Sequence, residues 1–254
     1  MHSACALVPV FNHERAVGQV IADLRSAGLP VVLVDDGSGP ACAAELDRLA
    51  GEDSAVSLVR LGKNQGKGGA VMAGLHAAEA AGFTHALQVD ADGQHDSNEV
   101  GRFLSASQAE PDKVICGEPV FDASMPGSRR YGRYLTHALV WLNTLSFSIR
   151  DSMCGFRIYP LRQVLPLLAN ETPGRRMDFD IEILVRLNWQ DVGMRWLPVR
   201  VSYPTDGVSH FHLLNDNWLI SWMHLRLFFG MLRRSPRLIG RQLRSRLNHG
   251  QVPT

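Results

Sequence analysis

Two acidic side chains stand one residue apart at the end of an apolar run. Asp90 and Asp92 follow residues 86–89 (Ala-Leu-Gln-Val), whose composition is typical of a buried strand. Two carboxylates at this spacing can turn toward one hard cation, and Mg²⁺ takes one or two carboxylates while phosphate oxygens and water complete its shell. The pattern predicts a metal that holds a diphosphate. A polar loop after a strand is the alternative interpretation.

Polar residues also follow two earlier apolar runs. Glu14 comes shortly after the run 7–11, and Asp35 and Asp36 come directly after the run 31–34. Ligands of open α/β sheets bind outside the carboxyl ends of the strands. We therefore expect these side chains to meet the acidic pair described above at one edge of a sheet.

A glycine-rich segment, residues 62–70, opens a helical pattern. It is not a Walker P-loop, because Gly62 precedes Gly66 and Lys67 by one residue too few and Gly68 replaces the required hydroxyl residue. A dinucleotide-binding glycine motif after the first strand is also missing. Two interpretations stay open: a glycine turn before a helix, or a backbone that approaches a nucleotide closely with Lys67 near its phosphates.

Four of these segments, in order, resemble family 2 glycosyltransferases with the GT-A fold, and in particular dolichyl- and polyprenyl-phosphate sugar synthases. They are Pro9–Glu14 (PVFNHE), Val34–Ser38 (VDDGS), Asn64–Gly68 (NQGKG) and Asp90–Gln94 (DADGQ). The resemblance covers residues 4–205. It implies an α/β GT-A fold, Rossmann-like, with a mainly parallel sheet flanked by helices, and transfer of a hexose from a UDP- or GDP-sugar.

The resemblance implies roles on the donor side. The residues expected to bind the nucleotide are Pro9, Phe11, Glu14, Asp35, Asp36, Lys67 and Asp90. Asp92 is expected to ligate Mg²⁺ or Mn²⁺, with Asp90 on the ribose or the metal and Gln94 completing the shell. Phe11 stands where the family more often has tyrosine, so it can stack on a base but lacks the hydroxyl.

The acceptor side is expected in three later segments. Arginine forks bind phosphate bidentately, and Arg129 and Arg133 are predicted to hold an acceptor phosphate, with a solvated basic face as the alternative. By resemblance, Asp151 and Arg157 support the acceptor pocket. His210, in a segment similar to one that closes over the donor, joins this group of acceptor-side residues.

Asp180 is the candidate catalytic base, although acids also favour the first turn of a helix. A single displacement at the sugar C1 inverts the anomeric centre, and the metal and Lys67 would stabilise the leaving diphosphate. A hydroxyl acceptor needs a general base, whereas a phosphate monoester with a second pKa of about 6 does not. A polyprenyl phosphate is the favoured acceptor. A glycolipid or glycan hydroxyl deprotonated by Asp180, and a non-catalytic nucleotide-sugar-binding scaffold, are the alternatives.

The elements that must position these residues follow from hydrophobic periodicity. Strand-like runs near 5–10, 31–35, 56–61, 85–90 and 113–117 alternate with helical patterns near 14–27, 41–50, 68–81 and 97–109. This alternation predicts βαβ units and a mainly parallel sheet. Further along, we expect a loop over 118–130, helices over 131–148 and 178–187, and strands near 154–159 and 195–203.

Composition is typical of a globular enzyme, with 254 residues, 45% hydrophobic and 20% charged. The net charge of +1 argues against a nucleic-acid binder. The four cysteines are scattered without a Cys-x-x-Cys pair, and the N-terminus runs straight into the first predicted strand. We therefore expect reduced thiols and a cytoplasmic protein without a signal peptide.

The C-terminal part differs in composition, so we divide the chain into a catalytic domain, 1–212, and a helical tail, 213–254. The apolar run 218–232 is shorter than the roughly 20 residues of a membrane-spanning helix, and six arginines follow it within residues 233–246. This pattern predicts an amphipathic helix on an anionic membrane surface, at the inner face of the membrane. A helix that packs on the catalytic domain or in a dimer is the alternative.

Overall fold

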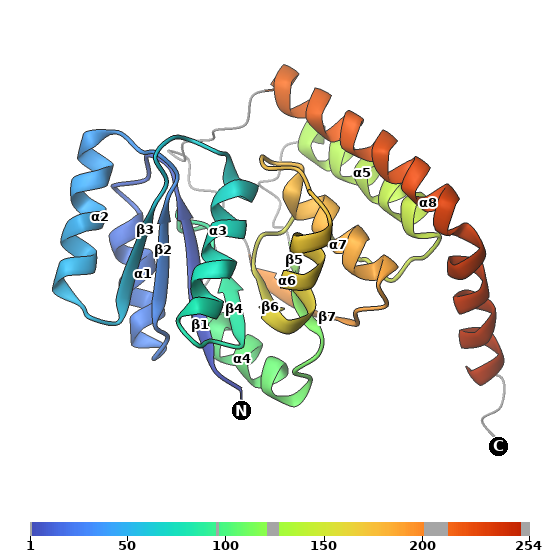
Figure 1. The fold of residues 1–254 in the computed structure, drawn as a ribbon, viewed down its shortest axis with the longest axis horizontal. Helices are drawn as coiled ribbons and strands as arrows, with labels where there is room; N and C mark the ends of the chain where they lie inside the picture. The colour runs from blue at the N-terminus through green and yellow to red at the C-terminus, as the bar shows by residue number, and fades with distance from the viewer. Residues whose placement is uncertain (1, 95–96, 121–126, 201–212, 250–254) are drawn as a thin grey trace.

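A seven-stranded sheet forms the centre of the computed structural model, which describes residues 2–94, 97–120, 127–200 and 213–249 (Figure 1). The strands are β1 (Ala4–Val10), β2 (Val31–Asp35), β3 (Val56–Arg60), β4 (His85–Gln88), β5 (Val114–Val120), β6 (Arg157–Pro160) and β7 (Met194–Arg200). Their spatial order is β3-β2-β1-β4-β6-β5-β7. Strand β6 is antiparallel to β4 and β5, and the other pairings of the described strands are parallel. The predicted α/β fold with a mainly parallel sheet is confirmed.

Helices cover both faces of this sheet. They are α1 (Val17–Ser26), α2 (Pro40–Glu52), α3 (Lys67–Ala80), α4 (Val100–Ala109), α5 (Gly127–Thr144), α6 (Leu161–Asn170), α7 (Phe179–Trp189) and α8 (Leu213–His249), with a short 3₁₀ turn η1 (Ser97–Glu99) before α4. Apolar residues of α1, α2 and α4 pack with one face of the sheet, and those of α3, α6 and α7 pack with the other. Helices α5 and α8 extend the second layer outward (Figure 1).

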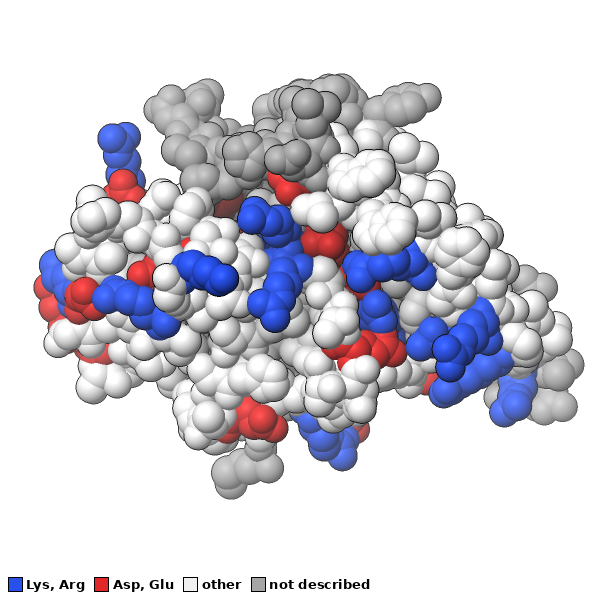
Figure 2. All heavy atoms as spheres, turned by 45° about the horizontal axis from the view of Figure 1, so that its top comes forward, with Lys and Arg blue, Asp and Glu red and all other residues white. Residues whose placement is uncertain are grey.

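The C-terminal helix α8 lies beside α5 and also contacts α7 (Figure 1). Met223, Leu227 and Met231 bury one side of it in the same core as α7. The opposite side exposes large apolar residues, among them Trp218 and Phe229. On the face of the molecule that Figure 2 shows, uncharged side chains cover the α5–α8 end, and basic side chains gather farther along α8. None of the described helices combines the length and hydropathy that a membrane span needs.

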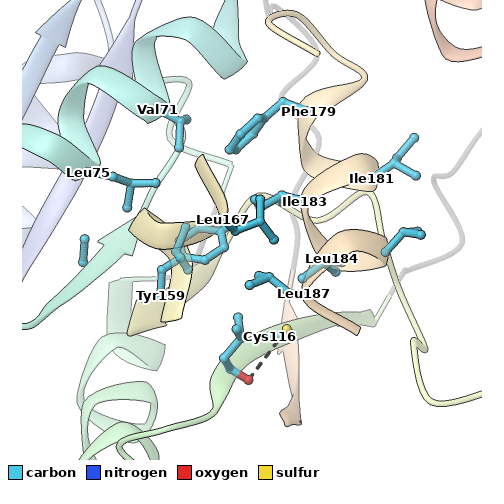
Figure 3. Packing of buried hydrophobic residues seen from close by; sticks show 14 of the residues in the cluster. Val71, Leu75, Cys116, Tyr159, Leu167, Phe179, Ile181, Ile183, Leu184 and Leu187 are labelled. Carbon is cyan, nitrogen blue, oxygen red and sulfur yellow. Dashed lines mark hydrogen bonds between the residues drawn. The ribbon is translucent and has the colours of Figure 1, made fainter. Parts of the chain in front are cut away.

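The core forms because the central strands bury both faces. All five residues of β2 are buried, and neighbouring residues of β1 point to opposite layers, Leu7 to the α3 side and Val8 to the α1 side. On the α3 side, Val71 and Leu75 lie across from Phe179 and the α7 leucines, above Tyr159 of β6 (Figure 3). This packing fixes α3 and the start of α7 against each other.

Two sequence expectations need correction. Helix α6 was not predicted; Pro166 lies inside it, and proline removes a helical amide donor. Burial of Leu161, Val164 and Leu165 outweighs that loss over a helix of only ten residues. The predicted loop 118–130 was also wrong in part, since β5 continues to Val120 and α5 already begins at Gly127.

Candidate active site

One lysine bridges two carboxylates that come from distant parts of the chain. Lys67 begins α3, and its Nζ lies 2.8 Å from Oδ1 of Asp90, after β4, and 2.9 Å from Oδ2 of Asp180, in the first turn of α7. Burial opposes the charge on Lys67, but the two carboxylates outweigh it and hold the pKa of the ammonium well above its ordinary value. The site therefore contains a permanent cation, which is suited to phosphate oxygens.

Gly155 closes one side of this cluster. A Cβ added to it would lie 2.9 Å from Nζ of Lys67 and from Nε2 of Gln88, and 3.0 Å from Oδ2 of Asp90. Contacts this short require the ends of these three side chains to move, so a larger residue here would displace the cluster. Gly155 was not among the predicted site residues. Its signal was its place between Asp151 and Arg157 in the family-like Asp-x-x-x-Gly-Phe-Arg segment.

Arg157 supports the cluster from inside the protein. Its guanidinium is fully buried and donates to the backbone carbonyls of Asp180 (2.6 Å) and Ser152 (2.8 Å). A side chain without exposure cannot contact an acceptor, so Arg157 can act on an acceptor pocket only as a support from within the protein and is not itself an acceptor-binding residue. Its Nη1 also lies 4.0 Å from the Asp180 carboxylate, which places a second cation beneath that group.

Asp180 is held on both carboxylate oxygens. Oδ2 pairs with Lys67, and Oδ1 accepts a hydrogen bond of 3.1 Å from Nε2 of Gln88. The residue is only 5% exposed. A general base must accept a proton from the attacking group, so this arrangement favours an anchor for Lys67 over the base that the sequence suggested.

Asp35 and Asp36 both bind other groups of the protein. The two oxygens of Asp36 accept the backbone amides of Gln65 (2.6 Å) and Gly66 (2.8 Å), and burial raises the pKa of this carboxyl. Asp35 pairs with Nε of Arg60 at 2.9 Å. Asp36 thus holds the glycine segment in place, and the predicted hydrogen bonds from these acids to a base or ribose stay a prediction.

The glycine segment packs closely against residues 174–179. A Cβ on Gly68 would lie 2.4 Å from Cβ of Phe179, and one on Gly66, whose φ is +86°, would lie 2.6 Å from the carbonyl oxygen of Arg175. The amide of Gly69 donates to the same carbonyl at 2.9 Å. Packing within the protein therefore requires Gly66 and Gly68, as expected for a glycine turn before a helix. Lys67, which lies between them, faces the two carboxylates.

The remaining donor-side residues lie at the carboxyl ends of β1 and β4. Pro9 and Phe11 are half-buried and Glu14 is exposed, while the Oδ1 of Asp92 accepts the backbone amide of Gln94 at 3.1 Å. Among the described residues, no three His, Cys, Asp or Glu side chains are placed to share an ion. Two carboxylates, Asp90 and Asp92, nevertheless fit Mg²⁺ or Mn²⁺ when phosphate oxygens and water supply the other ligands.

A second polar cluster joins α5 to the segment between α5 and β6. Asp151 is 3% exposed, and its Oδ2 pairs with Nε of Arg133 at 2.7 Å and lies 3.5 Å from Nε2 of His137. Burial opposes ionisation, but His137 and Arg133 outweigh it and hold the pKa of Asp151 well below its usual range. Asp151 thus orients Arg133 and His137 and is too buried to bind an acceptor itself.

His137 was missed by the sequence analysis, although it lies one helical turn after Arg133. Arg129 belongs to the described backbone of α5, but its side chain lies outside the described part of the structure, and His210 lies outside it altogether.

The sheet order and the acidic residues after β4 define a GT-A-type glycosyltransferase domain. The model of glycosyl transferase family 2 matches residues 5–164, and the chain belongs to this family of enzymes, as the sequence resemblance implied. A solved structure of Mycobacterium tuberculosis glucosyl-3-phosphoglycerate synthase, with Mn²⁺, UDP-glucose and phosphoglyceric acid, aligns with a TM-score of 0.63 at 12% identity, covering 91% of this chain and 79% of that one.

Curated relatives are also similar along most of the chain. Dolichyl-phosphate beta-glucosyltransferase of Drosophila melanogaster is 28% identical over 242 residues, covering 84% of this chain and 73% of the relative. Undecaprenyl-phosphate mannosyltransferase of Micrococcus luteus is 28% identical over 203 residues, covering 78% of this chain and 82% of the relative.

Proposed function

We propose that this glycosyltransferase moves a hexose from a UDP- or GDP-sugar to a polyprenyl phosphate, with inversion at C1 and with a divalent metal. The observation that carries this proposal is the engagement of Asp180 by Lys67 and Gln88 on its two oxygens. A hydroxyl acceptor would need that carboxylate as a base, whereas a phosphate with a second pKa of about 6 is already a nucleophile at neutral pH. The names of the Drosophila and Micrococcus relatives support the same acceptor class.

At the donor end, Asp90 and Asp92 would hold Mg²⁺ or Mn²⁺, which would neutralise charge on the leaving diphosphate. Lys67 supplies a second positive charge from the same cluster. The structure that aligns with this chain contains Mn²⁺ together with a nucleotide sugar. Charge compensation of the leaving group is then the main contribution of this end of the site to catalysis.

At the acceptor end, Arg133 is the described residue best suited to a phosphate. Asp151 holds its guanidinium, so the arginine loses less side-chain freedom when it binds an anion. His137 lies beside the same carboxylate and adds a second possible donor. Attack of the phosphate oxygen on C1, opposite the leaving diphosphate, would invert the anomeric centre.

We also propose that the protein is cytoplasmic and binds the inner face of the membrane through α5 and α8. Tyr134 and Leu135 of α5 are 60% and 62% exposed, and Trp218 and Phe229 of α8 are 71% and 62% exposed. Large aromatic side chains with arginines farther along the same helix are typical of interfacial helices on anionic lipid. A lipid-linked phosphate would lie in that surface.

Transfer assays with UDP-glucose and GDP-mannose, each with Mn²⁺, test this proposal. We expect undecaprenyl phosphate but not undecaprenol to be glycosylated, and the product to have the anomeric configuration opposite to that of the donor. Asp180→Asn should lose less than about tenfold in rate, because removal of a true general base costs about 10²–10⁴-fold. Asp112→Asn, at an exposed site, is the control.

Other results would change the assignment. Transfer to undecaprenol alone, with a loss of a hundredfold or more in Asp180→Asn, would establish a hydroxyl acceptor. Binding of a nucleotide sugar without transfer to either lipid would favour a non-catalytic scaffold. Flotation with anionic and neutral liposomes tests the membrane proposal separately, and a protein that floats with neither contradicts it.

A further inference from the structure

A buried charged cluster joins α7 to the C-terminal helix α8, away from the Lys67 carboxylates. Its centre is Glu182, which is fully buried. Oε1 of Glu182 pairs with Nη2 of Arg186 at 2.6 Å, and Oε2 pairs with Nη2 of Arg226, from α8, at 3.0 Å. Glu171, at the end of α6, extends the cluster, because it pairs with Arg186 and with Arg234 of α8. The Glu182 carboxylate thus joins two helices through residues that are 44 positions apart in the sequence.

The same oxygen also holds a loop. Oε2 of Glu182 accepts the backbone amide of Gly174 at 2.8 Å. The segment that Gly174 begins covers the glycine segment at the start of α3: the carbonyl of Arg175 accepts a hydrogen bond from the amide of Gly69, and the guanidinium of Arg175 donates to Oε1 of Gln65 at 2.8 Å. The Glu182 carboxylate is therefore one route of contact between α8 and the start of α3, beside the hydrogen bond of 3.0 Å that the amide of Arg176 donates to Oδ1 of Asp178.

The first turn of α7 serves both sites. Asp180 and Glu182 are two residues apart, and they point to different partners, Asp180 to Lys67 and Glu182 to Gly174 and α8. Phe179 anchors this turn in the core against Val71 of α3 (Figure 3). A change in the Glu182 cluster would consequently act on the Lys67 segment through the loop, while the core contact stays in place.

We propose that Glu182 is a positioning residue for donor binding. It holds residues 174–176 against the segment that carries Lys67, and its ion pair with Arg226 makes the order of that segment depend on α8. The inference rests on the proposed role of Lys67 at the donor diphosphate. It goes further by linking the affinity for a nucleoside diphosphate to the C-terminal helix, which lies outside the part of the chain that the family model matches.

Arg226→Met is the sharpest variant, because it keeps the apolar stem of a side chain that is 36% exposed and removes only the charged end. In hydrogen exchange, the amides of Gly174 and Gly69 should exchange about tenfold faster, because the free energy of local opening falls by about the net contribution of one hydrogen bond. Arg241→Met is the matched control: it removes an α8 arginine that pairs with Asp191 and has no contact with Glu182.

Binding of UDP and of GDP, each with Mn²⁺, is the second measurement. We expect weaker binding in Arg226→Met and in Glu182→Gln, no further loss in the double variant, since the two residues act in one path, and partial recovery in Arg226→Lys. Unchanged exchange at Gly174 in Arg226→Met, or an equal effect of Arg241→Met, would overturn the proposal. If the wild-type protein binds neither nucleotide, the donor assignment of Lys67 fails, and the exchange result still decides whether Glu182 holds the loop.

Discussion

Gly155 lies directly against the ammonium of Lys67, since a Cβ on the glycine would come within 2.9 Å of Nζ. We predict that Gly155→Ala displaces the ends of Lys67 and Asp90 and lowers the transfer rate by about tenfold, because displacements of about 1 Å at a reacting site can cost up to about a hundredfold. The measurement is the rate of sugar transfer at saturating donor. Gly101→Ala, where a Cβ meets no atom within 4 Å, should keep wild-type activity, and equal losses in both variants would contradict the prediction.

Removal of the buried guanidinium of Arg157 should destabilise the protein. Arg157→Met removes the guanidinium donor from the carbonyls of Asp180 and Ser152, and breaking a buried charged contact costs about 3–5 kcal/mol. Urea unfolding measures this loss. Arg162→Met is the control, because its ion pair with Asp112 is exposed and should contribute less than about 1 kcal/mol. A shift in the midpoint of the Arg157 variant no larger than in the control would mean that the buried pair contributes little.

Metal removal tests the carboxylates after β4. With EDTA we expect transfer to stop, and added Mn²⁺ or Mg²⁺ should restore it. Asp92→Asn should lower the rate about a hundredfold or more at the Mn²⁺ concentration that saturates the wild type, since a metal contributes several kcal/mol to the stability of a charged leaving group. Full activity of the Asp92 variant in EDTA would show that the reaction proceeds without the ion.

Stability should fall in mild acid because of His224 on α8. Burial lowers the pKa of this imidazole to about 4, from 6.5 in the unfolded chain, so the folded state excludes a proton that the unfolded state binds. Above pH 6.5, His224 does not reduce the free energy of unfolding. As the pH falls toward 4, the free energy of unfolding decreases, and the loss is about 2 kcal/mol at pH 5. Unfolding curves at pH 7 and pH 5 measure it.

The comparison of variants isolates this effect from other titrating groups. His224→Gln should lose less stability than the wild type between pH 7 and pH 5, whereas His76→Gln, at an exposed position on α3, should follow the wild type. Parallel losses in the His224 variant and the wild type would assign the pH dependence to other residues.

The strands and the positions of their polar ends were predictable, because buried runs such as 31–34 carry a clear local signal. The residues that these polar side chains contact were not predictable. Lys67 was expected at phosphates, but its bridge to Asp180 depends on how α7 packs against α3, which no local pattern contains. Arg157 illustrates the same limit: an arginine in a short strand reads as exposed, and only the neighbouring carbonyls explain why it can be buried.

The reversed strand β6 divides the sheet into two blocks with separate origins in the chain. Strands β1 to β4 and their loops supply Lys67 and the acidic pair after β4, whereas Arg133 and His137 come from the connection between β5 and β6. Because β6 is antiparallel to β4, that later connection returns to the same edge of the sheet, where Gly155 meets the Lys67 cluster of the earlier block. We therefore expect that exchange of residues 127–151 between related enzymes, which leaves Gly155 beside Lys67, would give hybrid proteins with new acceptor preferences and an inherited choice of nucleotide sugar.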